Sequence, residues 1–69
     1  MSNPASKIGA NIKKLRKQKG YSLEKISKLA NLSLNTVVKV ESGINKNPTI
    51  ETLTKIADAL NVKIDDLIK

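Results

Sequence analysis

Apolar residues recur at the spacing of an α-helix in five separate stretches of the chain. The first stretch runs from Pro4 to about Lys19, with Asn3 as its expected N-cap and Gly20 at its C-terminal end. Its two faces carry apolar residues (Ile8, Ile12 and Leu15) and basic residues (Lys7, Lys14 and Lys17). Gly9 lies inside this helix at a cost of about 1 kcal/mol relative to alanine, so we expect another helix to pack closely against it.

Two shorter stretches between Ser22 and Gly43 predict a pair of helices joined by a tight turn. Ser22 and Ser33 can each cap a helix N-terminus through the side-chain hydroxyl, and Asn31 tolerates the left-handed backbone of a turn. Gly43 follows the second helix, which we place at residues 34–42. The expected buried positions of the pair are Ile26, Ala30, Val37 and Val40.

The rest of the sequence predicts two more helices after a polar loop. Thr49 caps a helix that ends near Asn61. This helix has the strongest apolar period of the chain, at Ile50, Leu53, Ile56, Ala57 and Leu60. A last short helix is expected from about Ile64, where Lys63 is a weak N-cap but acidic residues occupy the first turn. The pattern therefore predicts a single all-α domain that spans residues 1–69.

Positive charge is concentrated in the first two thirds of the sequence. Of 13 Lys and Arg residues, residues 1–46 hold ten against two acids, whereas residues 47–69 hold three against four. A basic surface of this kind suits a polyphosphate, but exposed lysines also simply keep a protein soluble. Tyr21 is the only aromatic residue, which argues against the base stacking used by single-strand binders and favours duplex DNA.

The composition also disfavours several classes of function. Without cysteine or histidine, the chain has no disulfide and no thiolate or imidazole metal site, so we expect no metal, cofactor or small-molecule ligand. The acids show no catalytic pairing and there is no glycine-rich phosphate loop, so we expect no enzyme. No apolar run approaches the roughly 20 residues needed to span a bilayer. We therefore expect a cytoplasmic protein with no membrane partner.

Several short motifs match one family in order and spacing. In chain order they are Ile8-Gly9, Leu15-Arg16, Gly20-Tyr21-Ser22, Ile26, Ala30, Ser33, Thr36-Val37, Glu41-Ser42-Gly43, Pro48 to Leu53 and Ile56 to Val62. Together they resemble the phage repressor and Cro type of helix-turn-helix DNA-binding domain. The resemblance implies a compact five-helix, repressor-like domain. It also implies a transcriptional regulator, typically a repressor, that binds specific sequences in double-stranded DNA.

The resemblance implies that helix 34–42 enters the major groove while the helix before it crosses the DNA backbone. By position, the residues that face bases are Leu34, Asn35, Thr36, Val38 and Lys39. Asn35 suits adenine N6 and N7, and Lys39 suits guanine O6 and N7, although both could be merely solvated. The positions that hold phosphates are Ser22, Leu23, Ser33, Asn45, Lys46 and Asn47.

Two leucines depart from the family pattern. Many relatives have glutamine at the position of Leu23 and a polar or basic residue at the position of Leu34. We expect these leucines to contact each other and to turn a methyl surface toward thymine C5-methyl groups. The competing expectation is that direct readout is weak and that DNA shape supplies the specificity.

The resemblance also implies an ion pair inside the domain and a dimer. Arg16 and Glu41 match positions that pair between the first helix and the end of the recognition helix, and we expect their pair to be structural and partly buried. The implied two-fold homodimer places its recognition helices about 34 Å apart and reads a palindromic operator. It could form in solution or only on DNA. The candidate interface residues are Val62, Ile64, Leu67 and Ile68, for which ordinary core packing is the alternative.

A second function is open on the same scaffold. Leu23, Leu29 and Leu34 could form an exposed apolar surface of a protein-interaction module, for example an antitoxin-like partner. A steep loss of DNA affinity with salt would argue against that alternative. A membrane-surface peptide built on the lysine-rich first helix is disfavoured, because caps and core positions run through the whole chain.

Overall fold

Five helices make up the regular structure of residues 4–69, the part of the chain that the computed structural model describes. They are α1 (Pro4–Gln18), α2 (Leu23–Ala30), α3 (Leu34–Ser42), α4 (Ile50–Leu60) and α5 (Ile64–Ile68). The all-α, five-helix prediction is confirmed, and the helix limits agree closely with those expected from the sequence. The expected N-cap Asn3 lies outside the described residues.

Short polar side chains fix the ends of the helices. At the start of α4, Thr49 Oγ1 accepts a hydrogen bond from the Thr52 N–H at 3.1 Å. α2 and α4 end at Asn31 and Asn61, which have φ angles of 55° and 58°. Asparagine adopts this left-handed conformation more readily than other non-glycine residues, so these two positions stop their helices.

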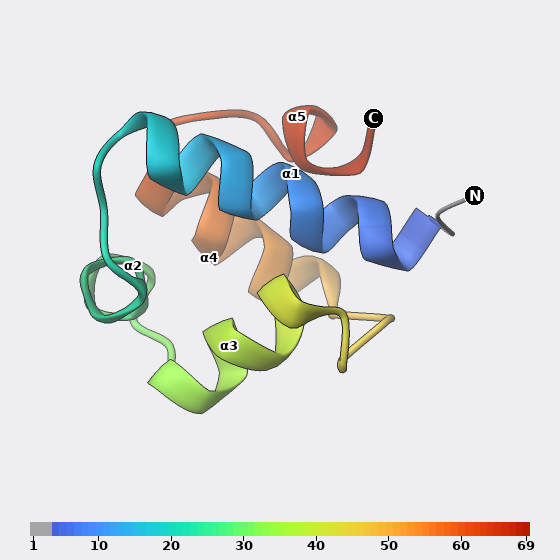
Figure 1. Cartoon of the computed structure of the whole chain (residues 1–69), viewed down its shortest axis with the longest axis horizontal. Helices are drawn as coiled ribbons and strands as arrows, with labels where there is room; N and C mark the ends of the chain where they lie inside the picture. The colour runs from blue at the N-terminus through green and yellow to red at the C-terminus, as the bar shows by residue number, and fades with distance from the viewer. Residues whose placement is uncertain (1–3) are drawn as a thin grey trace.

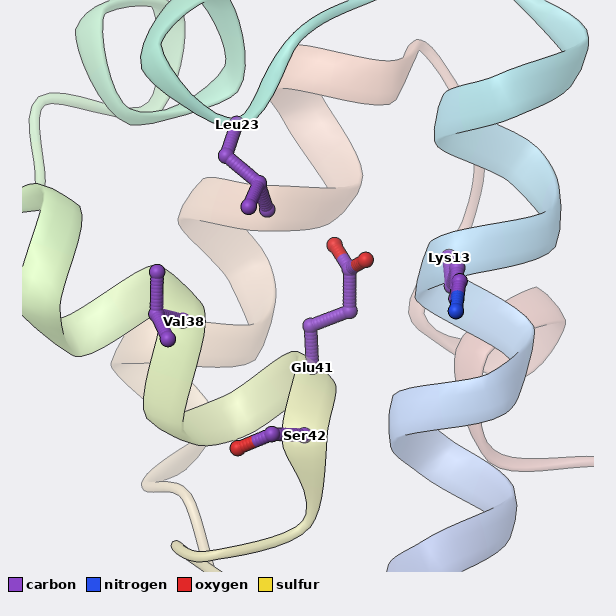
Figure 2. A pocket seen from close by; sticks show the side chains of 5 residues that line it. All are labelled: Lys13, Leu23, Val38, Glu41 and Ser42. Carbon is purple, nitrogen blue, oxygen red and sulfur yellow. The ribbon is translucent and has the colours of Figure 1, made fainter.

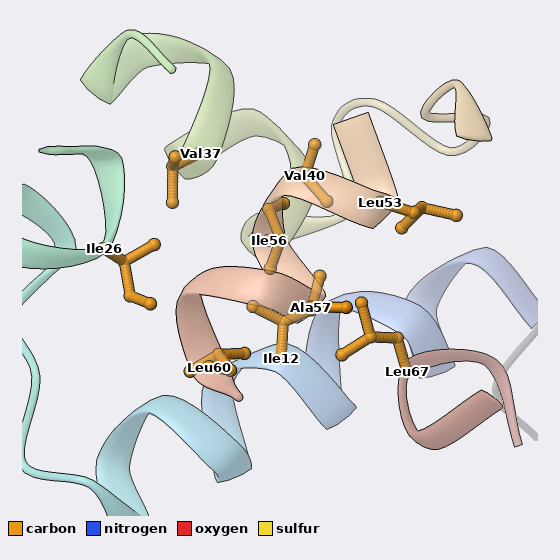
Figure 3. Close-up of a cluster of buried hydrophobic side chains, with 9 residues drawn as sticks. All are labelled: Ile12, Ile26, Val37, Val40, Leu53, Ile56, Ala57, Leu60 and Leu67. Carbon is orange, nitrogen blue, oxygen red and sulfur yellow. The ribbon is translucent and has the colours of Figure 1, made fainter. Parts of the chain in front are cut away.

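One apolar core joins all five helices (Figure 3). Its members are Ile12, Ile26, Val37, Val40, Leu53, Ile56, Ala57, Leu60 and Leu67. α4 packs against α2 and α5, while α1 packs against α3 and α5. α1 and α4 therefore lie between α5 on one side and the α2–α3 pair on the other (Figure 1).

α1 and α3 approach each other closely at Gly9. A Cβ atom on Gly9 would lie 2.5 Å from the carbonyl oxygen of Glu41 and 2.9 Å from that of Val40. Both distances are shorter than a normal carbon–oxygen contact, so a side chain at this position would push the two helices apart. The expectation that a second helix packs against Gly9 is confirmed, and that helix is α3.

α5 is held at both ends by contacts that the sequence pattern did not predict. At its start, Asp66 Oδ2 accepts a hydrogen bond from the Lys63 N–H at 3.1 Å, which compensates for the weak N-cap. This bond, together with the Lys69 ammonium, lowers the pKa of Asp66. At its end, Asn11 Nδ2 of α1 donates to the carbonyl oxygens of Leu67 and Lys69 at 2.9 and 3.0 Å.

Two apolar residues differ from their expected burial. Ile50 was expected in the core stripe of α4 but is 69% exposed, because it is the first residue of the helix and its side chain lies beyond the packed turns. Leu67 was expected at a dimer interface but has no exposed surface and belongs to the core. A side chain without exposed surface cannot contact a second chain, so Leu67 drops out of the predicted interface.

Candidate nucleic-acid interface

Serine and asparagine side chains set the geometry of α2, the turn and α3. Ser22 Oγ accepts from the Lys25 N–H at 3.0 Å, and Ser33 Oγ accepts from the Thr36 N–H at 3.1 Å. Between these two N-caps, the left-handed Asn31 ends α2. The chain therefore changes direction within residues 31–33, and α2 and α3 pack against each other as in a helix-turn-helix.

α3 has one buried and one exposed face. Val37 and Val40 are at most 1% exposed and pack into the core. Leu34, Asn35 and Lys39, which were expected to face bases, are all exposed. Asn35 and Lys39 are four residues apart, so they lie on the same side of the helix. An amide and an ammonium group thus occupy the solvent face of α3 together.

The two other residues expected to face bases are half-buried. Thr36 lies in the first turn of α3, where its hydroxyl is 2.8 Å from that of Ser33 and the two share a hydrogen bond. Val38 lies one residue before Lys39 and lines a cleft described below. Thr36 therefore helps to fix the start of the helix, and Val38 offers an apolar surface at the edge of its exposed face.

The residues expected to hold phosphates lie at two places on the surface. Ser22 and Ser33 are exposed at the N-termini of α2 and α3, where the first backbone N–H groups of a helix have no intrahelical acceptor. Asn45, Lys46 and Asn47 are exposed in the loop after α3. Asn45 orders this loop, because its backbone N–H donates to the Lys39 carbonyl at 2.9 Å and its Oδ1 accepts from the Asn47 N–H at 3.1 Å.

Leu23 lies in a cleft of about 160 Å³ between α1, α2 and α3 (Figure 2). The cleft is lined by Lys13, Leu23, Val38, Glu41 and Ser42. Leu23 is half-buried and packs against the core, whereas Leu34 is 43% exposed and does not line the cleft. Leu23 thus shares an apolar cleft with Val38, and its expected contact with Leu34 stays a prediction.

The position of Leu23 also affects the alternative function. A protein-interaction surface built on three leucines needs Leu23 exposed together with Leu29 and Leu34. With Leu23 half-buried, only Leu29 at 47% and Leu34 at 43% present large exposed areas. The structure therefore gives this alternative less surface than the sequence suggested.

Arg16 and Glu41 form a nearly buried ion pair between α1 and α3. Arg16 Nη2 lies 2.7 Å from Glu41 Oε1, and Nε donates to Oε2 at 2.9 Å, with the side chains 12% and 8% exposed. The hydrogen bond with this carboxylate raises the pKa of Arg16. Arg16 Nη1 also donates to the Tyr21 carbonyl at 2.8 Å, a contact that no residue-type pattern could indicate. One guanidinium therefore fixes α3 relative to α1 and to the loop before α2.

The lysines of this surface are not neutralised by nearby acids. Within residues 4–69, the ion pairs are Arg16–Glu41, Lys55–Glu51 at 4.0 Å and Lys69–Asp66 at 3.3 Å. Lys13, Lys39 and Lys46 thus remain unpaired there, and all three are exposed. Unpaired positive charge therefore lies on α3 itself, on α1 and in the loop after α3.

Residues 4–69 contain no group of three or more acidic, cysteine or histidine side chains that could hold a metal ion. None of the helices in this range is both long enough and apolar enough to cross a membrane. The candidate site is the exposed face of α3, on which Asn35 and Lys39 lie together.

The chain is similar in sequence and in fold to known helix-turn-helix proteins. A family model described as helix-turn-helix matches residues 12–67. The restriction-modification controller protein C.AhdI from Aeromonas hydrophila has a similar structure, with a TM-score of 0.87 and 32% identity over 91% of this chain and 94% of that one. The crystal structure of SinR, a master regulator for biofilm formation, in complex with DNA has a TM-score of 0.86 and 34% identity, covering 90% of this chain and 98% of that one.

A sequence relative extends beyond the matched region. The transcriptional regulator SinR of Bacillus subtilis is 34% identical over 61 residues, which cover 88% of this chain. The match covers only 55% of SinR, so this chain spans about half the length of that relative. The similarity therefore concerns the five-helix domain.

Proposed function

Because the chain belongs to the helix-turn-helix family of transcriptional regulators, we propose that it binds specific sequences in double-stranded DNA and represses transcription in the cytoplasm. The observation that carries the proposal is the exposed face of α3. Asn35 and Lys39 lie on the same side of a helix whose opposite side is buried at Val37 and Val40. The ion pair at Arg16 holds this helix in place, and SinR supports the same use of the fold because its crystal structure contains DNA.

In the proposed complex, α3 enters the major groove and reads base edges. The amide of Asn35 pairs with adenine N6 and N7, and the ammonium of Lys39 donates to guanine O6 and N7. Leu34 and Val38, which lie four residues apart on one side of α3 next to Asn35, offer apolar surface to thymine methyl groups. Thr36 acts indirectly, because its hydroxyl is bonded to Ser33 at the start of the helix.

Phosphate contacts on both sides of α3 fix its register on the duplex. Backbone N–H groups at the starts of α2 and α3, next to Ser22, Leu23 and Ser33, lie at the positive ends of the helix dipoles. The loop at residues 45–47 adds the unpaired Lys46 and two exposed amides. These contacts give affinity that depends on salt but carry no sequence information.

We also propose that two copies bind one operator as a two-fold dimer. The interface candidates that keep exposed surface are Val62, Ile64 and Ile68, of which Ile68 is 50% exposed. A two-fold pair predicts a palindrome with half-sites about 34 Å apart. Sedimentation with and without the duplex separates a stable dimer from one that forms only on DNA.

Selection of bound sequences from random duplexes tests the proposed function. We expect a palindromic motif to be enriched and its affinity to fall steeply with salt. Asn35→Ala should remove the preference for adenine at one position of each half-site, at a cost of about 1–3 kcal/mol. Gln18→Ala, which also removes an exposed amide but on α1, should leave the selected motif unchanged. No enrichment and no dependence on salt would contradict DNA binding and would favour a protein partner.

A further inference from the structure

The cleft between α1, α2 and α3 contains two polar groups that the proposed contacts do not use. Lys13 comes from α1 and Ser42 from the last position of α3, and they lie on either side of the cleft (Figure 2). Leu23 and Val38 supply its apolar walls. The cleft thus combines a cation, a hydroxyl and two hydrocarbon surfaces within about 160 Å³.

Charge in this cleft is unbalanced in favour of an anion. Glu41 also lines the cleft, but both of its carboxylate oxygens are bonded to Arg16, at 2.7 and 2.9 Å. Lys13 forms no ion pair within residues 4–69 and is exposed. Arg16 therefore neutralises the Glu41 carboxylate, and the ammonium group of Lys13 carries the uncompensated charge.

The hydroxyl of Ser42 is also available to a ligand. Its Oγ donates to the Lys39 carbonyl at 3.4 Å, which is long for a hydroxyl hydrogen bond. A phosphate oxygen near the mouth of the cleft could replace this weak acceptor. Leu23 is the first residue of α2, so the N-terminal end of that helix dipole also favours an anion here.

The apolar walls narrow the choice of anion. Leu23 and Val38 would desolvate a small free ion without bonding it, but they can pack against the C–H surface of a deoxyribose. Val38, which lines the cleft, also lies at the edge of the exposed face of α3 proposed to read bases. The backbone of the DNA strand that α3 reads is therefore the occupant whose chemistry and position both fit.

We propose that Lys13 and Ser42 bind one phosphate of the DNA backbone at the mouth of this cleft, with the adjoining deoxyribose packed against Leu23 and Val38. This inference rests on the proposed function and adds α1 to the elements that contact DNA. It makes Lys13 a residue that contributes affinity and register without reading a base.

Lys13→Gln and its neighbour Lys14→Gln form a matched test. Both replace an exposed lysine of α1 by glutamine, but Lys14 lines a different cleft, between α1 and α5. Each phosphate contact contributes about −0.9 to the slope of log K against log salt concentration. Loss of one contact should therefore make this slope shallower by about 0.9 and weaken binding about eightfold in roughly 0.1 M salt. We expect Lys13→Gln to show this loss and Lys14→Gln to bind like the wild type, with both variants melting normally.

A neutral methylphosphonate placed at one position of the duplex at a time locates the contact. The wild type should lose affinity when the methylphosphonate occupies one particular position, whereas the affinity of Lys13→Gln should not change with that substitution. Ser42→Ala should bind the unmodified duplex more weakly and lose less affinity than the wild type from the methylphosphonate at the same position. If the wild type binds the selected duplex but Lys13→Gln and Lys14→Gln behave alike, the inference is wrong and the proposed function stands. If the wild type does not bind DNA, the proposed function itself fails.

Discussion

Replacing Gly9 with alanine should destabilise the domain, although alanine is the better helix former. In an exposed helix interior the change would stabilise by about 1 kcal/mol. At Gly9, however, the new methyl group would lie 2.5 and 2.9 Å from two backbone carbonyl oxygens of α3. Backbone atoms cannot rotate away as a flexible side chain can, so α1 and α3 must separate.

The expected change in the free energy of unfolding combines the steric cost of the methyl group with the gain in helix propensity. Overpacking of this kind costs about 1–3 kcal/mol, occasionally more, and separating α1 from α3 also lengthens the Arg16–Glu41 bonds. Because both contacts are below 3 Å and involve backbone atoms, we place Gly9→Ala in the upper part of that range, at about 2–3 kcal/mol, which leaves a net loss of about 1–2 kcal/mol after the gain in helix propensity. In a domain of this size, that loss lowers Tm by roughly 5–15 °C.

Thermal and urea unfolding followed by circular dichroism measure this loss. The control is Ala10→Gly, because Ala10 is the exposed neighbour of Gly9 in α1 and should lose only the helix-propensity term of about 1 kcal/mol. The two substitutions run in opposite chemical directions, yet both should lower Tm. A Gly9→Ala protein that melts at or above the wild-type temperature would show that the two helices are not in contact there.

Three further predictions concern the ion pair, the start of α5 and thymine contacts. Glu41→Gln leaves the nearly buried Arg16 without its carboxylate, so it should lower the free energy of unfolding by about 3–5 kcal/mol. The control Asp58→Asn, at an exposed position, should change it by less than about 0.5 kcal/mol. Equal effects of the two variants in urea titrations would refute a structural role for the ion pair. The pKa of Asp66 is lowered on folding, so its contribution to stability is complete above the unfolded-state pKa of about 3.9 and is lost as pH falls through the folded-state pKa. Asp66→Asn should therefore melt below the wild type at about pH 6 and together with it at about pH 2. Replacing thymine by uracil in the selected duplex should weaken binding by the wild type but not by Leu34→Ala; no effect on the wild type would favour readout of DNA shape.

The helices were predictable because local interactions define them. Ser22, Ser33 and Thr49 each bond an N–H three residues later, and Asn31 and Asn61 need only their own backbone conformation. None of these interactions depends on a residue far away in the chain. A single sequence therefore carried enough information to set the helix limits and the outline of the helix-turn-helix.

Burial at helix ends was less predictable, because periodicity gives the face of a helix but not which turns another helix covers. Ile50 fits the apolar stripe of α4 but lies beyond the part that α2 and α5 cover. For Leu67 the sequence left a dimer interface and core packing open, and the packing of α5 against α1 buries it completely.

The candidate site was predicted in part. The pairing of Arg16 with Glu41 was expected from family resemblance, whereas the bond of Arg16 to the Tyr21 carbonyl has no signal in residue type. The cleft at Leu23 depends on how α1, α2 and α3 come together, so neither it nor Lys13 could be identified beforehand. The residues that contact DNA remain predictions.

The contact between the first helix and the last one has a consequence for synthesis on the ribosome. Asn11 bonds the carbonyl of Leu67 across 56 residues, and Ile12 packs in the same core as Leu67. α1 leaves the ribosome first, but its apolar face has no complete partner until α5 has followed. Because closing so long a loop must precede those contacts, the final core forms late. During that interval the uncovered apolar face of α1 makes the unfinished chain prone to aggregation.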